Sequence, residues 1–115
     1  MKIGTDITVI SRIEKSYNKF GKKFLDRFLT QEEQNLSSKI ESIAGYWASK
    51  EAISKALGCG IGAELSFLDI TIYKDKKNAP HFKLSTKAQK LHKIKNSSLS
   101  IAHDGGFAIA VVIIM

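Results

Sequence analysis

The stretch from Trp47 to Gly58 constrains the fold more than any other part of this sequence, because it has helical spacing and few positions suited only to water. Its apolar residues cover several faces of the expected helix: Ala52, Ile53, Ala56 and Leu57. Such a helix is predicted to lie at the centre of its domain. Gly58 is well placed to end it as a left-handed residue.

Trp47, Glu51 and Lys55 recur every four residues, so they fall on one face of this helix. A Glu-to-Lys pair at this spacing is most often a surface ion pair worth a few tenths of a kcal/mol, about 0.2–0.5. The same two groups at the edge of a core or in a cleft would instead form a functional site. The stretch by itself favours the ion pair.

Before this helix, Lys2 to Ile7 is predicted to be a short strand that presents Asp6 at its end. Helical spacing then runs from Val9 to Gly21, and the basic residues of this region predict either a solvated surface or a docking face: Arg12, Lys15, Lys19, Lys22, Lys23 and Arg27. Thr30 and Glu33 form a capping box that begins the next helix. Ser38 or Ser42 is expected to cap the central helix.

After the central helix the hydrophobic period changes toward two. Phe67 to Tyr73 and Pro80 to Leu84 predict a hairpin, with Pro80 at a strand start or on an edge. A short helix is expected from Thr86 to Ile94. The Asp104-Gly105 turn predicts a second hairpin, whose last strand, Phe107 to Met115, is apolar on both faces. That strand is expected to be central or to be covered in an oligomer.

Together these elements predict a single α+β domain over residues 1–115, with an N-terminal strand and helices packed on a mostly antiparallel sheet. One cysteine, Cys59, excludes an internal disulfide and is expected to pack as a small residue. Neither a signal peptide nor a membrane-spanning run is evident, so a cytoplasmic protein without membrane partners is predicted.

The formal net charge of +7 predicts an anionic partner, but it does not choose among nucleic acid, an acidic surface, a phosphorylated small molecule and an acidic protein. One hypothesis is therefore a small basic module that binds nucleic acid or an acidic surface. The other is an enzyme. Carboxylates from separate elements, Asp6 and Glu51, suit Mg²⁺ better than zinc, and Lys55 could neutralise a departing phosphate. His103 alone is more typical of a turn or packing residue.

Three segments together resemble the holo-acyl carrier protein synthases, the small class of 4′-phosphopantetheinyl transferases. The first is Gly4-Thr5-Asp6-Ile7 followed by Arg12-Ile13, and the second runs from Trp47 to Ala56 with Gly60-Ile61-Gly62 behind it. The third is Leu99-Ser100-Ile101-Ala102-His103-Asp104. The order and separation of the three segments make the resemblance specific over nearly the whole chain.

The resemblance implies transfer of 4′-phosphopantetheine from coenzyme A to a serine of an apo acyl carrier protein, with Mg²⁺ and with release of adenosine 3′,5′-bisphosphate, as in fatty acid biosynthesis. Asp6 and Glu51 correspond to the Mg²⁺ ligands, and Lys55 to a lysine near the reacting diphosphate. Arg12 and Arg27 match basic positions at which the acidic carrier protein docks. Glu51, another carboxylate or a metal-activated water could take the serine proton.

The resemblance also implies a homotrimer with active sites at subunit interfaces and no nucleic-acid partner, with His103 completing a neighbour's site at the 3′-phosphate. The segments expected to contact coenzyme A, besides Lys55 and His103, are Gly60, Ile61, Gly62 and Pro80. Tyr46 stands where several relatives carry arginine, so a phosphate or carrier contact is either missing or supplied by Lys50 or another lysine. Ala102 stands where serine or threonine is common.

Overall fold

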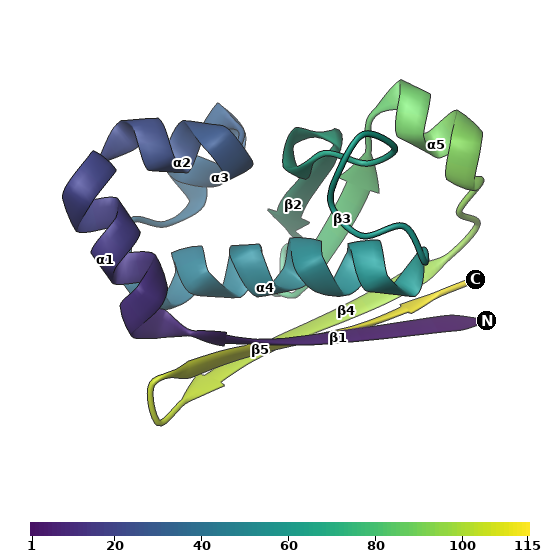
Figure 1. The fold of residues 1–115 in the computed structure, drawn as a ribbon. Helices are drawn as coiled ribbons and strands as arrows, with labels where there is room; N and C mark the ends of the chain where they lie inside the picture. The colour runs from purple at the N-terminus through teal and green to yellow at the C-terminus, as the bar shows by residue number, and fades with distance from the viewer.

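A three-stranded antiparallel sheet carries the long helix α4 across one face, and the remaining elements cover the other side of that helix (Figure 1). The structure is a computed structural model that describes residues 1–115. Its elements are β1 (Lys2–Val9), α1 (Ile10–Phe20), α2 (Lys22–Phe28), α3 (Gln31–Leu36), α4 (Ile40–Ala56), the 3₁₀ helix η1 (Phe67–Asp69), β2 (Ile70–Lys74), β3 (Pro80–Leu84), α5 (Thr86–His92), β4 (Ser97–Asp104) and β5 (Phe107–Ile114).

The helix α4 lies at the centre of the domain, as its sequence predicts. It packs against all strands of the three-stranded sheet on one side, and the hairpin of β2 and β3 lies with α2 and α3 on its other side (Figure 1). Most of its residues are therefore buried, including Ala44, Ala48, Ala52 and Ile53, each 0% exposed. Burial from both sides explains why its apolar positions do not form a single stripe.

The last strand, β5, is central in the sheet order β1-β5-β4, which confirms one of the two alternatives that its composition left open. Its side chains alternate regularly between the two faces. Small or branched residues face α4 and are buried: Ala108, Ala110, Val112 and Ile114. The opposite face exposes Phe107, Ile109, Val111 and Ile113, beside Ile3 and Ile7 of β1. One face of the sheet is thus apolar and uncovered in the single chain.

The strand β1 approaches α4 closely because Gly4 has no side chain. A Cβ atom at this position would lie 2.1 Å from the Ala52 carbonyl oxygen and 2.9 Å from the Ala56 Cβ. No substituent fits there without moving backbone, so position 4 requires glycine for space. This contact brings the following residues of β1 against the last turns of α4.

A buried ion pair joins α3 to α4. The Lys50 ammonium donates to Glu33 Oε1 at 2.8 Å and to the carbonyl oxygens of Phe28 and Phe67 at 2.6 and 3.0 Å, and both charged side chains are 0% exposed. Glu33 also accepts from the Ile72 amide at 2.7 Å and from the Thr30 amide at 2.8 Å. Every hydrogen of the ammonium has an acceptor, so the pair is fully satisfied inside the core.

Several expected boundaries are wrong. The run from Phe67 to Tyr73 begins with one turn of 3₁₀ helix, and only Ile70–Lys74 is a strand. The N-cap of α4 is Lys39 rather than Ser38 or Ser42, and no side chain caps it. The segment Lys22–Phe28 forms a helix that the sequence did not predict, since Gly21 reads as a stop.

Other details agree with the sequence. Pro80 starts β3, and the Thr30–Glu33 capping box is present with both hydrogen bonds. Gly58 is left-handed with φ of 78°. The helix α5 ends at His92, two residues before the expected Ile94. None of the helices combines the length and apolarity that crossing a bilayer requires.

Candidate active site

A cleft of about 360 Å³ lies where the end of β1 meets α1 and α4. Its polar wall comes from Asp6, Thr8, Arg12 and Glu51, and its apolar wall includes Trp47 and Phe24. The indole of Trp47 packs in turn on Phe67 with ring centroids 4.7 Å apart, which fixes that wall. Trp47 and Glu51 thus share one face of α4, as the sequence spacing predicts.

The carboxylate of Asp6 is held from two directions. Thr8, two residues along the same strand face, donates its hydroxyl to Asp6 Oδ2 at 2.7 Å. The Lys55 ammonium donates to Asp6 Oδ1 at 2.9 Å and to the Thr5 carbonyl oxygen at 3.2 Å. Because the Asp6 side chain is only 14% exposed, its position is well defined. Each oxygen still has a lone pair available for another ligand.

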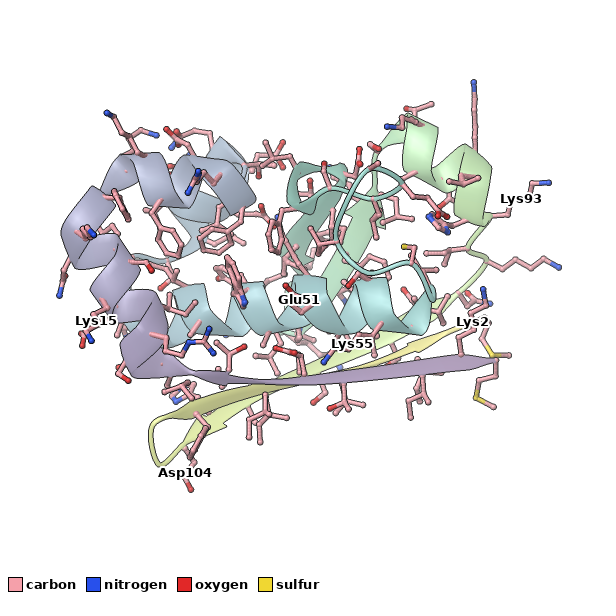
Figure 2. All side chains as sticks on the ribbon, in the orientation of Figure 1. Lys2, Lys15, Glu51, Lys55, Lys93 and Asp104 are labelled. Atoms are coloured by element: carbon pink, nitrogen blue, oxygen red, sulfur yellow. The ribbon has the colours of Figure 1, made fainter.

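Glu51 lies one helical turn before Lys55 and points into the cleft without an ion-pair or hydrogen-bond partner of its own (Figure 2). Burial raises the pKa of the Glu51 carboxyl, and the neighbouring charge of Asp6 raises the pKa further, against a smaller opposing effect of Lys55. Lys55 pairs with Asp6, so the surface ion pair between Glu51 and Lys55 that the helical stretch by itself favours does not form. A half-buried carboxylate beside another carboxylate is a site suited to a cation.

Lys55 is the exposed cation of the site. Its side chain is 55% exposed although its ammonium reaches across to β1 (Figure 2). An ammonium in this position can turn from Asp6 to an incoming phosphate oxygen, while the Thr8 hydroxyl continues to donate to the Asp6 carboxylate. Lys55 and Asp6 come from residues 49 positions apart, and the close contact at Gly4 makes their meeting possible.

The two arginines expected at a docking face lie on adjacent helices. Arg12 on α1 borders the cleft and Arg27 lies on α2; both side chains are exposed, and neither forms an ion pair within the chain. Lys22 of the same region is partly neutralised by Asp26 at 2.9 Å. The surface beside the cleft mouth therefore carries uncompensated positive charge.

His103 does not line the cleft of Asp6 and Glu51. It is on β4, paired with Ala108 of β5, whereas Asp6 is on β1, paired with Ala110, so the central strand separates the two residues. Two strand spacings and an offset of two residues along the strands place their Cα atoms about 12 Å apart. Within one chain, Asp6, Glu51 and Lys55 are brought together and His103 is not.

His103 lies instead in a second hollow of about 280 Å³ with Pro80, Asn78 and Tyr46. The Tyr46 hydroxyl is buried without a hydrogen-bond partner, and burial raises the pKa of this phenol, so it remains a neutral donor. Two residues expected to contact one ligand, Pro80 and His103, thus share a hollow even though they are far apart in the sequence.

Gly60, Ile61 and Gly62 lie in the loop that follows α4, outside both hollows. The Gly62 amide donates to the Leu65 carbonyl at 2.9 Å, which closes this loop on itself. The prediction that Lys50 could make the contact of the arginine that relatives carry at position 46 is wrong, because the Lys50 ammonium is enclosed in the core with Glu33. Burial lowers the pKa of Lys50, with Glu33 opposing the shift.

The sequence-based predictions miss two interactions: one inside the cleft, made by Thr8, and one in the core beside it, between Glu33 and Lys50. Thr8 follows Asp6 at the two-residue spacing of a strand face, a signal that could have identified it. The Glu33–Lys50 pair gives no such signal, because its partners lie 17 residues apart on separate helices.

The chemistry of the donors fits a hard divalent cation. Mg²⁺ is usually held by one or two carboxylates together with water and substrate phosphates. Asp6 and Glu51 supply those carboxylates from different elements, and no sulfur or imidazole competes in the cleft. With Lys55 and Arg12 at its margin, the cleft is suited to a phosphorylated ligand.

Known proteins match this chain over nearly its whole length. A sequence model described as the 4′-phosphopantetheinyl transferase superfamily matches residues 2–112. Holo-[acyl-carrier-protein] synthases are similar at 56% identity in Sulfurovum sp. strain NBC37-1, covering 99% of this chain and 96% of that protein, and at 59% in Campylobacter lari, covering 97% of each. The crystal structure of the Helicobacter pylori synthase in complex with coenzyme A superposes with a TM-score of 0.95, at 54% identity over 98% of this chain and 99% of that one.

Proposed function

Because this chain belongs to the holo-[acyl-carrier-protein] synthases of the 4′-phosphopantetheinyl transferase superfamily, we propose that its Asp6–Glu51 cleft is the place where phosphopantetheine leaves coenzyme A. The acceptor is a serine of an apo acyl carrier protein, and the second product is adenosine 3′,5′-bisphosphate. A basic nucleic-acid module does not account for family membership or for paired carboxylates in a cleft. The observation that carries the proposal is the unpaired Glu51 carboxylate beside Asp6.

Asp6 and Glu51 would hold Mg²⁺, which when bound supplies charge neutralisation at the diphosphate of coenzyme A. The donor set supports this assignment, since both ligands offer carboxylate oxygens and the Glu51 oxygens have no competing partner in the chain. Thr8 orients Asp6 by its 2.7 Å hydrogen bond to Oδ2. The two carboxylates are thereby preorganised for the same cation.

The reaction that follows is a phosphoryl-type displacement. The serine hydroxyl oxygen attacks the phosphorus that carries the pantetheine arm while its proton passes to a carboxylate or to water, and the bond from that phosphorus to the bridging oxygen breaks. Lys55, exposed and close to Asp6, neutralises the charge that gathers on the departing bisphosphate. Trp47 and Phe24 shield the same cleft from one side and so limit the access of competing water.

The basic surface of α1 and α2 would receive the carrier protein. Arg12 at the cleft margin and Arg27 on the next helix are free of internal ion pairs, so they are available to an acidic partner. Complementary charge increases the association rate and fixes orientation more than it increases affinity. Docking on this surface would bring the acceptor serine to the side of the cleft where Glu51 lies.

The uncovered face of the three-stranded sheet supports association of the chain, and the family resemblance implies that the oligomer is a trimer. Ile3, Ile7, Ile109 and Val111 are 71%, 62%, 40% and 38% exposed and lie together on neighbouring strands. A contiguous apolar face of this kind is typical of an oligomer interface. Association through it would also allow His103 of one subunit to complete the Asp6–Glu51 cleft of the next.

A direct test combines the protein with coenzyme A, Mg²⁺ and an apo acyl carrier protein, and follows the phosphopantetheine adduct by mass spectrometry. Glu51→Gln should abolish most of the transfer, whereas Glu32→Gln, on exposed α3, is the matched control and should retain it. Wild-type transfer that persists in excess chelator, or an active Glu51→Gln protein, would contradict the proposed metal site.

The shared site can be tested by complementation. Glu51→Gln and His103→Ala proteins, each inactive alone, are refolded together. If each site takes Glu51 and His103 from different subunits, equal mixing restores about a quarter of wild-type activity. If both residues act within one chain, no activity returns. Light scattering on the same samples reports whether the chain forms a trimer.

A further inference from the structure

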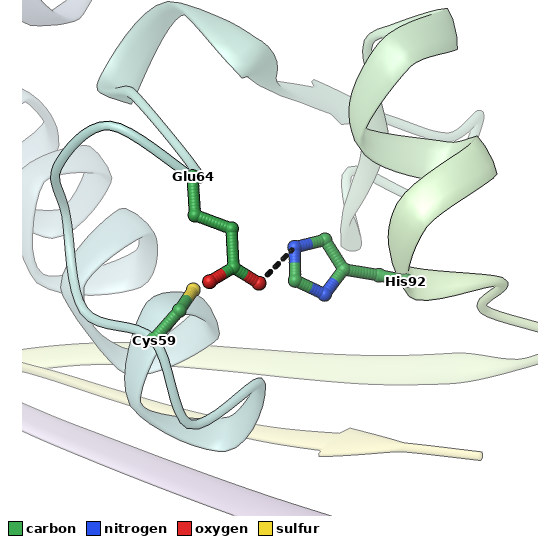
Figure 3. A group of neighbouring side chains, drawn as sticks. All are labelled: Cys59, Glu64 and His92. Carbon is green, nitrogen blue, oxygen red and sulfur yellow. Dashed lines mark ion pairs between the residues drawn. The ribbon is translucent and has the colours of Figure 1, made fainter.

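The loop after α4 and the end of α5 bring a thiol, a carboxylate and an imidazole together (Figure 3). One ligand atom each of Cys59, Glu64 and His92 lies within 4.8 Å of the other two. Cys59 is the single cysteine of the chain. None of these residues borders the cleft of Asp6 and Glu51, and none is used by the proposed reaction.

The imidazole of His92 is the unusual member of this cluster. Its side chain is only 7% exposed, yet Nε2 has no hydrogen-bond partner. The nearest carboxylate oxygen, Glu64 Oε1, is 3.8 Å away, which is too far for a hydrogen bond (Figure 3). A buried ring nitrogen without a partner is destabilising, so its retention requires an explanation. Nε2 is the ring nitrogen that lies nearest the Glu64 carboxylate, and the Cys59 sulfur lies within 4.8 Å of both groups.

We propose that Cys59, Glu64 and His92 form a zinc site. Sulfur, imidazole nitrogen and carboxylate oxygen are all common Zn²⁺ ligands, whereas Mg²⁺ prefers oxygen alone. Ligands at about 2.0–2.3 Å in a tetrahedral site lie roughly 3.3–3.7 Å apart, so the present separations need only small side-chain movements. The Glu64 side chain, 53% exposed, can make that movement.

Zinc binding would replace the long contacts of the Cys59 thiol with Ser54 and of His92 with Glu64 by metal–ligand bonds. The Cys59 thiol now faces the Ser54 carbonyl at 3.9 Å, and it would lose its proton to solvent as the Zn–S bond forms. The fourth coordination position would face the solvent beside Glu64 and take water. The ion would thereby connect the loop that contains Gly60 and Gly62 to α5, two segments that otherwise share few hydrogen bonds.

An ion pair between His92 and Glu64 is the competing explanation. It accounts for two of the three groups, but it leaves the thiol unused. It also predicts that added metal has no effect. Metal binding therefore separates the two explanations without reference to transfer activity.

Co²⁺ provides the sharpest probe, because a thiolate–Co²⁺ bond absorbs in the near ultraviolet and only Cys59 can form one. Chelator-stripped full-length protein is titrated with Co²⁺ and then with Zn²⁺. We expect the thiolate band to saturate at one Co²⁺ per chain and to disappear as Zn²⁺ displaces it. Absence of the band in the wild-type protein overturns the proposal.

Variants then assign the ligands. Cys59→Ser should lack the band, and His92→Gln should weaken Zn²⁺ binding by about 10- to 100-fold or more, because loss of even a group that only orients a ligand has an effect of that size. His81→Gln, which removes the other paired histidine, and Glu51→Gln, which alters the proposed Mg²⁺ site, should leave the band unchanged. Equal Zn²⁺ affinity in the wild-type and His92→Gln proteins would overturn the proposal, and circular dichroism verifies that each variant is folded.

Discussion

Two acid–lysine pairs lie along α4, five residues apart, with nearly equal lengths and different surroundings. Lys50 contacts Glu33 at 2.8 Å with both side chains 0% exposed, and Lys55 contacts Asp6 at 2.9 Å with side chains 55% and 14% exposed. The inner pair has every donor and acceptor filled by protein. The outer pair borders a cleft and leaves Glu51 unpaired beside it. Distance alone therefore does not distinguish a structural ion pair from a reactive one; access and unused bonding capacity do.

The largest expected effect comes from breaking the inner pair. Lys50→Met leaves the buried Glu33 carboxylate without its ion-pair partner and should reduce the free energy of unfolding by about 3–5 kcal/mol. Urea denaturation measures this change. Lys22→Met, in the exposed pair with Asp26, is the matched control and should show no measurable loss. An inner-pair variant as stable as wild type would contradict a structural role for the pair.

Breaking the outer pair should act on turnover rather than on stability. Lys55→Met removes the more exposed partner and leaves Asp6 its hydrogen bond from Thr8, so the free energy of unfolding should fall by only about 1 kcal/mol. The transfer rate should fall by roughly 100-fold, as for removal of one group that stabilises charge in a transition state. Single-turnover assays with saturating coenzyme A measure the rate. A Lys55→Met protein that is much less stable than wild type but fully active would reverse the two assignments.

These two pairs also show what sequence patterns can predict. Helical spacing correctly placed Trp47 and Glu51 on one face, and the change of period correctly gave an α+β fold. The central place of β5 was one of two alternatives that its apolar composition left open. The strand expected from Lys2 to Ile7 continues to Val9, so Asp6 lies within β1 and not at its end. Its pairing with Glu51 follows from the two residue types and from the family resemblance. Burial of Lys50 could not be predicted, because two of its acceptors are backbone carbonyls of Phe28 and Phe67, which no residue type reveals.

A smaller effect should follow from changing the orientation of Asp6. Thr8→Val keeps the buried shape of the side chain but removes the hydroxyl that donates to Asp6 at 2.7 Å. We expect a loss of about 1 kcal/mol in the free energy of unfolding and a higher Mg²⁺ requirement for transfer, since the carboxylate would no longer be held. Magnesium titration of the initial rate tests the second effect. Thr5→Val, exposed on the opposite face of β1, is the control.

The smallest effect concerns the stability contributed by Glu51. Its pKa is raised by burial and by Asp6, so the protonated form is favoured in the folded chain. That contribution is fully present below the ordinary pKa of glutamate and is lost as pH rises through the raised pKa. Without Mg²⁺, Glu51→Gln should therefore become more stable than wild type with rising pH, by a few tenths of a kcal/mol after solvent screening.

The measurement is a series of thermal unfolding curves between acidic and neutral pH for wild type and Glu51→Gln. Adding Mg²⁺ should stabilise only the wild-type protein at the higher pH, because a ligand that binds the folded state raises its stability. The change in the free energy of unfolding would then have opposite signs at two adjacent positions. Loss of the charge destabilises the protein at Lys50 and stabilises it at Glu51. If the stability difference between wild type and Glu51→Gln stayed constant across the pH series, the raised pKa of Glu51 would be contradicted.

The absence of a side chain at Gly4 gives the Gly4-Thr5-Asp6 segment a physical meaning. Alternate residues of β1 face α4, and each has a different role. Gly4 leaves room for the backbone of α4, Asp6 binds Lys55 through its carboxylate, and Thr8 orients that carboxylate by a hydrogen bond. The contributions of Asp6 and Thr8 depend on Gly4, because a larger side chain at position 4 would push β1 from α4 and carry the Asp6 carboxylate out of reach of Lys55. Gly4, which contacts no substrate, thus determines whether Asp6 can act on one.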